Sequence, residues 1–121
     1  MSESALAGVR VVELAGDTAG PYAAKLFADY GADVIKIEQP GVGDLSRRKG
    51  PFPNDIPDPE KSLQFLYLNT NKRYVTVDVR KPEGMTILKR LVTDADIFVL
   101  DLLPAEMEEL GLTWKAMSAL N

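Results

Sequence analysis

The 121-residue chain contains neither cysteine nor histidine. Without cysteine it can form no disulfide, no thiolate metal site and no cysteine nucleophile. Without histidine it lacks the side chain that most often serves as a general base, and a Ser-His-Asp triad is excluded. Any chemistry carried by these residues therefore depends on carboxylates, lysines, arginines, hydroxyl groups and the backbone.

The sequence also has no long apolar run and no excess of positive charge. No segment approaches the roughly 18 consecutive apolar residues that a membrane-spanning helix needs. The first residues, MSESALAG, lack the basic and apolar regions of a secretory signal. The formal net charge of −4 disfavours sequence-independent binding to nucleic acid. We therefore expect a cytoplasmic protein that binds neither membranes nor nucleic acids.

What the chain does contain is an alternation of strand-like and helix-like segments. Short apolar runs rich in β-branched residues are typical of buried parallel strands, and the alternating valines of RYVTVDV indicate a half-exposed strand. The pattern predicts an α/β fold, an open and mostly parallel Rossmann-like sheet with flanking helices. The predicted strands cover residues 9–14, 33–38, 73–79 and 96–102.

Helices are predicted between these strands, each with an apolar stripe that should face the sheet. Prolines at 21, 82 and 104 suit first helical turns, Gly31 suits a helix end, and Thr113 could cap a last short helix. Residues at helical spacing form the expected stripes. These are Tyr22, Leu26, Phe27 and Tyr30 in the first helix, and Ile87, Leu88, Leu91 and Val92 in the second.

Residues 39–62 interrupt this regular pattern. The segment QPGVGDLSRRKGPFPNDIPDPEKS is rich in proline and glycine and has no apolar period. It predicts a long surface loop, and loops of this length in compact domains are usually functional or mobile.

The turn after the first strand does not carry a conventional nucleotide motif. A dinucleotide fingerprint needs G-x-G-x-x-G, whereas the turn reads Gly16-Asp17-Thr18-Ala19-Gly20. Glu38 stands about where a ribose-binding carboxylate would, which is a weak match on its own, and a Walker A sequence is absent. The small residues at the helix start would let an acyl oxygen or a phosphate approach its free N–H groups. They would equally suit tight helix–strand packing without a ligand.

Charged side chains near the predicted loops and strand ends leave similar alternatives. Basic residues could pair with phosphates or could simply be solvated surface. They form two clusters, Arg47, Arg48 and Lys49 in the long loop and Lys72, Arg73 and Arg80 around the third strand. Asp101 follows the last strand, where it could border the crevice of an open α/β sheet or could cap the helix that begins at Pro104.

Several blocks of the sequence resemble one known family. The stretch GVRVVELAGDTAGPYAAKLFADYGADVIKIEQPGVGD, followed by NTNKRYVTVDVRKPEG and by LGLTWKAM, is similar to the N-terminal part of the class III CoA-transferases. This is the CaiB/BaiF group, which includes formyl-CoA transferase, carnitine CoA-transferase and α-methylacyl-CoA racemase. The resemblance extends from Leu6 to Asn121, and its blocks occur in the family order.

The resemblance implies a particular architecture and chemistry. Residues 1–121 would be the incomplete N-terminal part of the family's Rossmann-like large domain, in a homodimer whose subunits interlock. The reaction would move CoA from an acyl-CoA thioester to a small carboxylic acid through an aspartyl intermediate. The nucleophilic aspartate of the family lies beyond the matching region, so we expect no catalytic residue here. CoA would be a substrate, and neither a tightly bound cofactor nor a metal is expected.

The resemblance also implies candidate contacts with CoA. The loop Asp17-Thr18-Ala19 matches the loop that lines the thioester end, and Val77 and Arg80 match positions near the adenine and its phosphate. Asp101 and Leu102 replace an Asn-Phe pair that lies beside the CoA chain. Lys72 and Arg73 could add positive charge.

Two departures keep other functions open. Asp101 stands where the family has an amide, and Glu109 stands where arginine is common, so both place negative charge near a polyanionic ligand. Gln39 also replaces a basic residue of some members. The chain could therefore be a non-catalytic scaffold or the degenerate half of a tandem protein. A racemase-like fragment is a further alternative, although that reaction needs a histidine and a carboxylate from elsewhere.

Overall fold

A computed structural model describes residues 3–121 as a four-stranded, all-parallel sheet with helices on both faces. The spatial order of the strands is β3-β2-β1-β4, so the chain crosses from one side of β1 to the other after β3. This confirms the α/β class and the parallel sheet that the sequence predicts. The strands are β1 (Arg10–Leu14), β2 (Asp33–Glu38), β3 (Arg73–Thr76) and β4 (Ile97–Leu100).

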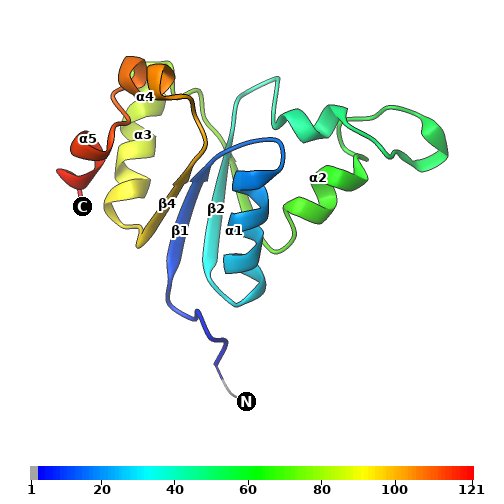
Figure 1. Cartoon of the computed structure of the whole chain (residues 1–121), viewed down its shortest axis with the longest axis horizontal. Helices are drawn as coiled ribbons and strands as arrows, with labels where there is room; N and C mark the ends of the chain where they lie inside the picture. Colours follow the sequence, from blue (N-terminus) through cyan, green and yellow to red (C-terminus); the bar gives the residue numbers. More distant parts are fainter. Residues whose placement is uncertain (1–2) are drawn as a thin grey trace.

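The connections between the strands are helical, and they cover opposite faces (Figure 1). Helix α1 (Ala19–Asp29) joins β1 to β2, and α3 (Pro82–Thr93) joins β3 to β4. Helices α4 (Pro104–Leu110) and α5 (Trp114–Ser118) follow β4 and lie beside α3 in Figure 1. No helix among residues 3–121 is both long and apolar enough to cross a bilayer.

Two apolar cores lie on the two faces of the sheet. Alternate residues of a strand point to opposite faces, so Val11 joins the core under α1 whereas Val12 joins the core under α3. Leu88 and Val92 of α3 are buried in the second core. Ala24 and Ala28 of α1 are buried in the first.

The apolar stripe predicted for α1 is wrong for most of its members. The buried face of this helix consists of Gly20, Pro21, Ala24 and Ala28. Three of the predicted residues, Tyr22, Leu26 and Tyr30, are exposed, and Phe27 is only half-buried. The helix packs close to the sheet through small residues, and its large side chains consequently point outward. In α3 the prediction fails at one residue, because Ile87 is exposed while Leu88 and Val92 are buried.

The long loop is more ordered than the sequence predicts. It contains the short 3-10 helices η1 (Leu45–Arg48) and η2 (Pro53–Asp55), and it leads into α2 (Leu63–Leu68), which the sequence analysis missed. Asp44 caps η1 and Ser62 caps α2, each by accepting a hydrogen bond from a backbone N–H. Local capping therefore organises a segment that has no apolar period. Strand β3 is also shorter than predicted and ends at Thr76.

Candidate functional site

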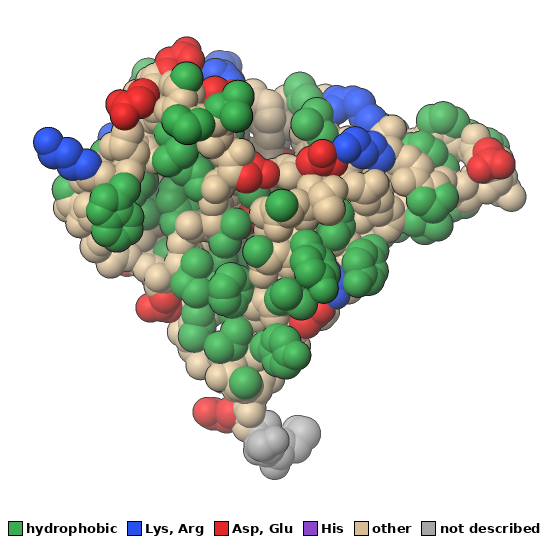
Figure 2. Space-filling model, viewed as in Figure 1, with side chains coloured by type: hydrophobic (Ala, Val, Ile, Leu, Met, Phe, Trp, Pro, Cys, Tyr) green, Lys and Arg blue, Asp and Glu red, His purple; other side chains and the backbone are tan. Residues whose placement is uncertain are grey.

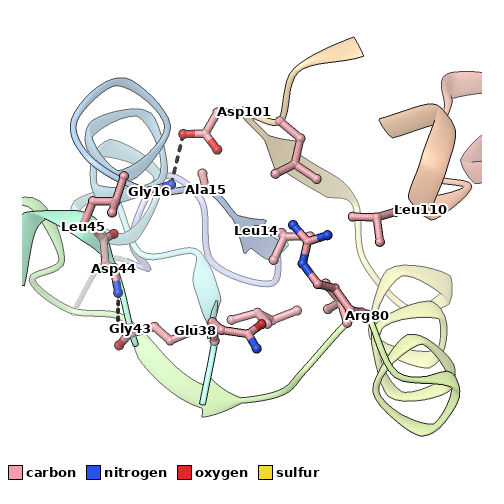
Figure 3. Close-up of a pocket in the computed structure, with 14 residues that line it drawn as sticks. Leu14, Ala15, Gly16, Glu38, Gly43, Asp44, Leu45, Arg80, Asp101 and Leu110 are labelled. Atoms are coloured by element: carbon pink, nitrogen blue, oxygen red, sulfur yellow. Dashed lines mark hydrogen bonds between the residues drawn. The ribbon is translucent and has the colours of Figure 1, made fainter. Parts of the chain in front are cut away.

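A groove lies at the carboxyl ends of the parallel strands (Figure 3). It has a volume of about 210 Å³ and is bordered by the segments that follow β1, β2 and β4. This edge of an open parallel sheet is where ligands commonly bind. Apolar side chains form much of the wall, and the polar groups include Glu38, Asp44, Arg80 and Asp101.

The loop after β1 is fixed by hydrogen bonds from its own backbone. The N–H of Gly16 donates to Asp101 at 3.0 Å, and the N–H of Asp17 donates to Asp44 at 3.0 Å. The Asp17 carboxylate pairs with the Lys49 ammonium. Asp17 has a φ of 63°, a left-handed conformation that aspartate tolerates better than most residues. The loop therefore has one defined shape, with Asp17 half-buried.

Of the two roles that the sequence left open for the start of α1, the structure shows tight packing, and contact with a ligand stays a prediction. At Gly20 the packing alternative holds, because an added Cβ would lie 2.4 Å from the Cβ of Ala15. Thr18 and Ala19, in contrast, are exposed. The Gln64 side-chain amide donates a hydrogen bond of 3.2 Å to the Thr18 hydroxyl, and neither Thr18 nor Ala19 borders the groove directly.

Asp101 borders the groove, which is one of the two positions predicted for it; the other was a helix cap. One carboxylate oxygen accepts the hydrogen bond from Gly16, and the side chain is exposed. It does not cap the next helix, because the N-cap of α4 is Leu103. Leu102 is half-buried and also lines the groove.

Arg80 is the one predicted cation that lines the groove. It is exposed, and its guanidinium lies 3.8 Å from the carboxylate of Glu106 in α4. Such an exposed and long ion pair is weak, so Arg80 remains available to an anion. Val77 is buried in the core under α3, 6% exposed, and is not among the groove-lining residues.

The other predicted cations lie away from the groove. The Lys72 ammonium is buried and reaches Glu13, the carbonyl oxygen of Pro21 and the side chain of Asn69. Arg73 forms two hydrogen bonds to Asp33, at 2.8 and 2.6 Å, at the opposite end of the sheet. Both residues thus have internal partners.

The basic residues of the long loop are similarly engaged. The Arg47 guanidinium donates two hydrogen bonds to Glu38 and lies 3.7 Å from the centre of the Phe65 ring. Arg48 donates to the carbonyl oxygen of Val42, and Lys49 pairs with Asp17. Because Glu38 is held in this way, it is not a free ribose-binding carboxylate in the described chain.

Four charged side chains form a buried cluster between the sheet and the first turn of α1. The buried charge cluster consists of Glu13, Lys36, Asp44 and Lys72, and its formal charge is zero because two cations face two anions. Lys36 lies 2.9 Å from Glu13 and 2.7 Å from Asp44, and Lys72 lies 2.8 Å from Glu13. Such a cluster is tolerable in a core only because every charge has a partner of opposite sign.

The sequence analysis missed this cluster, although a signal was present. Glu13 and Lys36 each interrupt an apolar strand, and the two residues are directly opposite each other in the β1–β2 register. Two opposite charges in strands predicted to be buried indicate a cross-strand ion pair. The participation of Asp44 and Lys72 depends on how the chain folds back over the sheet, which no local pattern encodes.

The burial of these groups changes their acid–base behaviour. Burial lowers the pKa of Lys72 to about 8, against the opposing attraction of Glu13. Burial would by itself raise the pKa of Asp44, but the hydrogen bond and charge of Lys36 and the bonds from Ser46 hold it below its ordinary value. The pKa of Glu38 is lowered in the same manner, since the bonds from Arg47 and from the Asp44 N–H outweigh burial. Asp44 and Glu38 are therefore anionic at neutral pH.

Among residues 3–121 no group of acidic side chains is arranged to hold a metal ion. The groove combines one exposed cation, Arg80, and apolar walls with the acidic residues Glu38, Asp44 and Asp101.

Comparison with known proteins identifies relatives of this chain. The sequence profile described as CoA-transferase family III matches residues 6–121. Formyl-CoA:oxalate CoA-transferase of Escherichia coli O139:H28 is 38% identical over 116 residues, which are 96% of this chain and 27% of that protein. The chain thus spans about a quarter of the length of that relative.

Solved structures agree with this result. A CaiB/BaiF family protein from Brucella suis is 34% identical with a TM-score of 0.87, over 99% of this chain and 32% of that one. A hypothetical protein from Mycobacterium tuberculosis is 33% identical with a TM-score of 0.83, over 98% of this chain and 31% of that one. The extent of the sequence match and the shared fold together place the chain in CoA-transferase family III.

Proposed function

We propose that the groove at the carboxyl ends of the strands binds CoA and acyl-CoA. The observation that carries this proposal is the position of Arg80, an exposed cation on a groove whose walls are mostly apolar, opposite the loop that leads into α1 (Figure 3). CoA has a polyanionic nucleotide end and a long, mostly neutral arm that ends in a thiol. Arg80 would offset phosphate charge, while the apolar wall and the exposed helix start would receive the arm.

In this arrangement the loop Asp17-Thr18-Ala19 lies at the thioester end. Thr18 is the N-cap of α1 and Ala19 is its first residue. Both are exposed, and the N–H groups of this first turn favour a partial negative charge. A thioester carbonyl oxygen placed there would accept a hydrogen bond from the backbone. Asp101 and Leu102 would flank the arm between this point and Arg80.

The reaction we propose is transfer of CoA from an acyl-CoA donor to a small carboxylic acid. Membership of the family supports it, and the aspartate that would carry the covalent intermediate lies outside these residues. Small-molecule sites usually enclose about 300–1,000 Å³. The groove is smaller at about 210 Å³, which supports the proposal that residues 1–121 form part of a larger domain whose other segments complete the site. We propose an interlocked homodimer on family membership alone.

A second function is favoured by the charge at the groove. Asp101 lines the groove, and Glu106 of α4 is the partner of Arg80. Negative charge beside a polyanion weakens its binding, so these residues support a scaffold that has kept the fold and lost affinity for CoA. An α-methylacyl-CoA racemase would use the same groove, but no feature of the groove favours racemisation over transfer.

Isothermal titration calorimetry with CoA separates binding from a scaffold role. We expect wild-type protein to bind CoA and Arg80→Ala to bind it about tenfold more weakly, since a charge-assisted contact with phosphate is lost. Arg73→Ala is the matched control, because Arg73 pairs with Asp33 at the other end of the sheet. Equal weakening by both substitutions, or no binding by the wild type, would refute the proposal.

A further inference from the structure

The loop at the predicted thioester end is held from outside, by residues of the long segment 39–62. Asp44 accepts the hydrogen bond from the Asp17 N–H, and Lys49 pairs with the Asp17 carboxylate. Asp17 thus has a partner on its backbone and another on its side chain. Both partners belong to the same excursion, which runs along the side of the groove (Figure 3).

Asp44 is itself held by several partners. The oxygen that receives the Asp17 N–H also accepts from the N–H and the hydroxyl of Ser46, at 2.8 and 2.7 Å. The other oxygen lies 2.7 Å from the Lys36 ammonium, and the backbone N–H of Asp44 donates to Glu38 at 2.8 Å. The side chain is fully buried, so it cannot exchange these partners for water.

The same cluster also holds the residue at which the loop begins. Lys36 donates a hydrogen bond of 3.0 Å to the carbonyl oxygen of Ala15 while it faces Asp44. The segment from Ala15 to Asp17 is therefore tied at both ends to one buried ion pair. Asp17, which carries the second of these contacts, has a left-handed conformation. This conformation turns the chain toward Thr18 and Ala19, which are both exposed.

We propose that Asp44 is a positioning residue for the acyl-thioester end of the ligand. By fixing the Asp17 peptide it sets the direction in which the chain leaves the groove edge at Gly16 toward Thr18, Ala19 and the start of α1. This inference rests on the proposed function, and it gives the buried charge cluster a role in ligand binding in addition to its role in the core. The Asp44 side chain is fully buried, so it acts on the ligand only through the loop that it holds.

The proposal predicts a selective loss of affinity. Acetyl-CoA reaches the loop after β1, whereas adenosine 3′,5′-bisphosphate, the nucleotide end of CoA, reaches only the region of Arg80. Asp44→Ala removes the acceptor of the Asp17 N–H and should weaken acetyl-CoA binding about tenfold. Asp44→Asn keeps an acceptor oxygen and should weaken it less. Neither should change the affinity for the bisphosphate by more than about twofold.

Calorimetric titration of both ligands tests this prediction. Asp33→Asn is the control, because it removes a charge partner of Arg73 far from the groove and should leave both affinities unchanged. If the wild type binds neither ligand, the proposed function fails. If it binds both and the Asp44 variants bind both equally well, or lose both in parallel, the positioning role alone is overturned.

A second variant keeps the test decisive if the Asp44 variants do not fold. Lys49 is exposed and pairs with Asp17, so Lys49→Ala should fold and still loosen the loop. We expect a loss of acetyl-CoA affinity of about threefold, with the bisphosphate unaffected. Unchanged acetyl-CoA affinity together with rapid hydrogen exchange of the wild-type Asp17 N–H would overturn the proposal.

Discussion

At the scale of single residues, the proposed CoA groove combines a cation that would attract CoA with an anion that would oppose it. Arg80 and Asp101 both line the groove, and Asp101 is bonded to the Gly16 N–H. The Asp101 carboxylate therefore does two things, since it holds the loop after β1 and adds negative charge beside the ligand site. A substitution that separates the two effects shows how much the charge matters.

Asp101→Asn makes this separation. The amide oxygen can still accept from Gly16, while the negative charge is gone, so we expect CoA to bind roughly threefold more tightly. The gain should shrink as salt is added, because exposed charges are screened. Titrations at low and high ionic strength would measure it. Weaker binding by this variant would mean that the carboxylate contacts the ligand favourably.

Lys72 gives a second prediction at this scale. Its pKa of about 8 in the folded protein lies below its ordinary value of 10.5. Between these two pH values the unfolded chain binds the proton more strongly, so the contribution of Lys72 to stability rises with pH. The free energy of unfolding of the wild type minus that of Lys72→Met should accordingly increase from pH 8 to pH 10. Urea denaturation across this range measures the difference, and a constant or falling difference would contradict the account.

At the scale of elements, the sequence was sufficient for the strands and for the crossover helices. Periodicity and terminal prolines predict β1, β2, β4, α1 and α3 with small errors at the ends. The inward face of α1 was not predictable by hydrophobicity, because the sheet is approached through Gly20, Ala24 and Ala28. Hydrophobic size indicates burial only where the distance between elements allows a large side chain.

The candidate site was predictable in part for a related reason. Asp101 follows a strand end, and such residues meet at one edge of a parallel sheet, whereas Arg80 and Leu102 were singled out as CoA contacts by the family resemblance. The sequence pattern does not distinguish Lys72 and Arg73 from Arg80, but Lys72 forms an ion pair with Glu13 and Arg73 forms one with Asp33. Which of these three basic residues remains accessible to a ligand depends on carboxylates that are distant in the sequence. The sequence pattern alone therefore could not identify it.

A substitution at Gly84 tests how closely the start of α3 packs against the turn that precedes it. In an unconstrained helix, replacement of glycine by alanine stabilises by about 1 kcal/mol. Here an added Cβ would lie 1.9 Å from the carbonyl oxygen of Asp78, which belongs to the turn before the helix. We therefore expect Gly84→Ala to destabilise the protein by roughly 2 kcal/mol in chemical denaturation. Lys89→Ala, at an exposed position of the same helix, should be close to neutral, and a stabilised Gly84→Ala protein would show that the approach is looser than described.

At the scale of the whole molecule, one face carries large apolar side chains that are exposed. Figure 2 shows apolar side chains gathered over the part of the surface that α1 occupies in Figure 1. Contiguous exposed apolar surface of this kind usually marks an interface. The exposed residues of α1 and α2 are Tyr22, Leu26, Tyr30, Leu63, Leu66 and Tyr67.

We therefore expect the 121-residue chain to self-associate through this face. Sedimentation velocity should show concentration-dependent species larger than a monomer. Leu26→Lys and Tyr30→Lys together should shift the population toward the monomer, because both side chains are exposed and neither belongs to the core. Ile87→Lys, at an exposed position of α3, is the control. A monodisperse wild-type monomer would contradict the expectation.

The nucleophilic aspartate that we place outside these residues gives another prediction for the molecule as a whole. The 121-residue chain should show no CoA transfer between a thioester and a carboxylic acid, even where it binds CoA. A coupled assay for free and acylated CoA would detect turnover. Measurable transfer by this chain would mean that one of its own carboxylates acts as the nucleophile.

The most direct test of the central claim is a map of CoA binding by NMR spectroscopy. When CoA is added to the ¹⁵N-labelled chain, the account predicts that the backbone amides shifted most belong to the carboxyl ends of the strands, notably Gly16, Gly43 and Leu102, together with Arg80. Amides at the amino ends, such as those of Arg10 and Arg73, should stay in place. Shifts confined to the amino ends, or a spectrum unchanged at millimolar CoA, would contradict it.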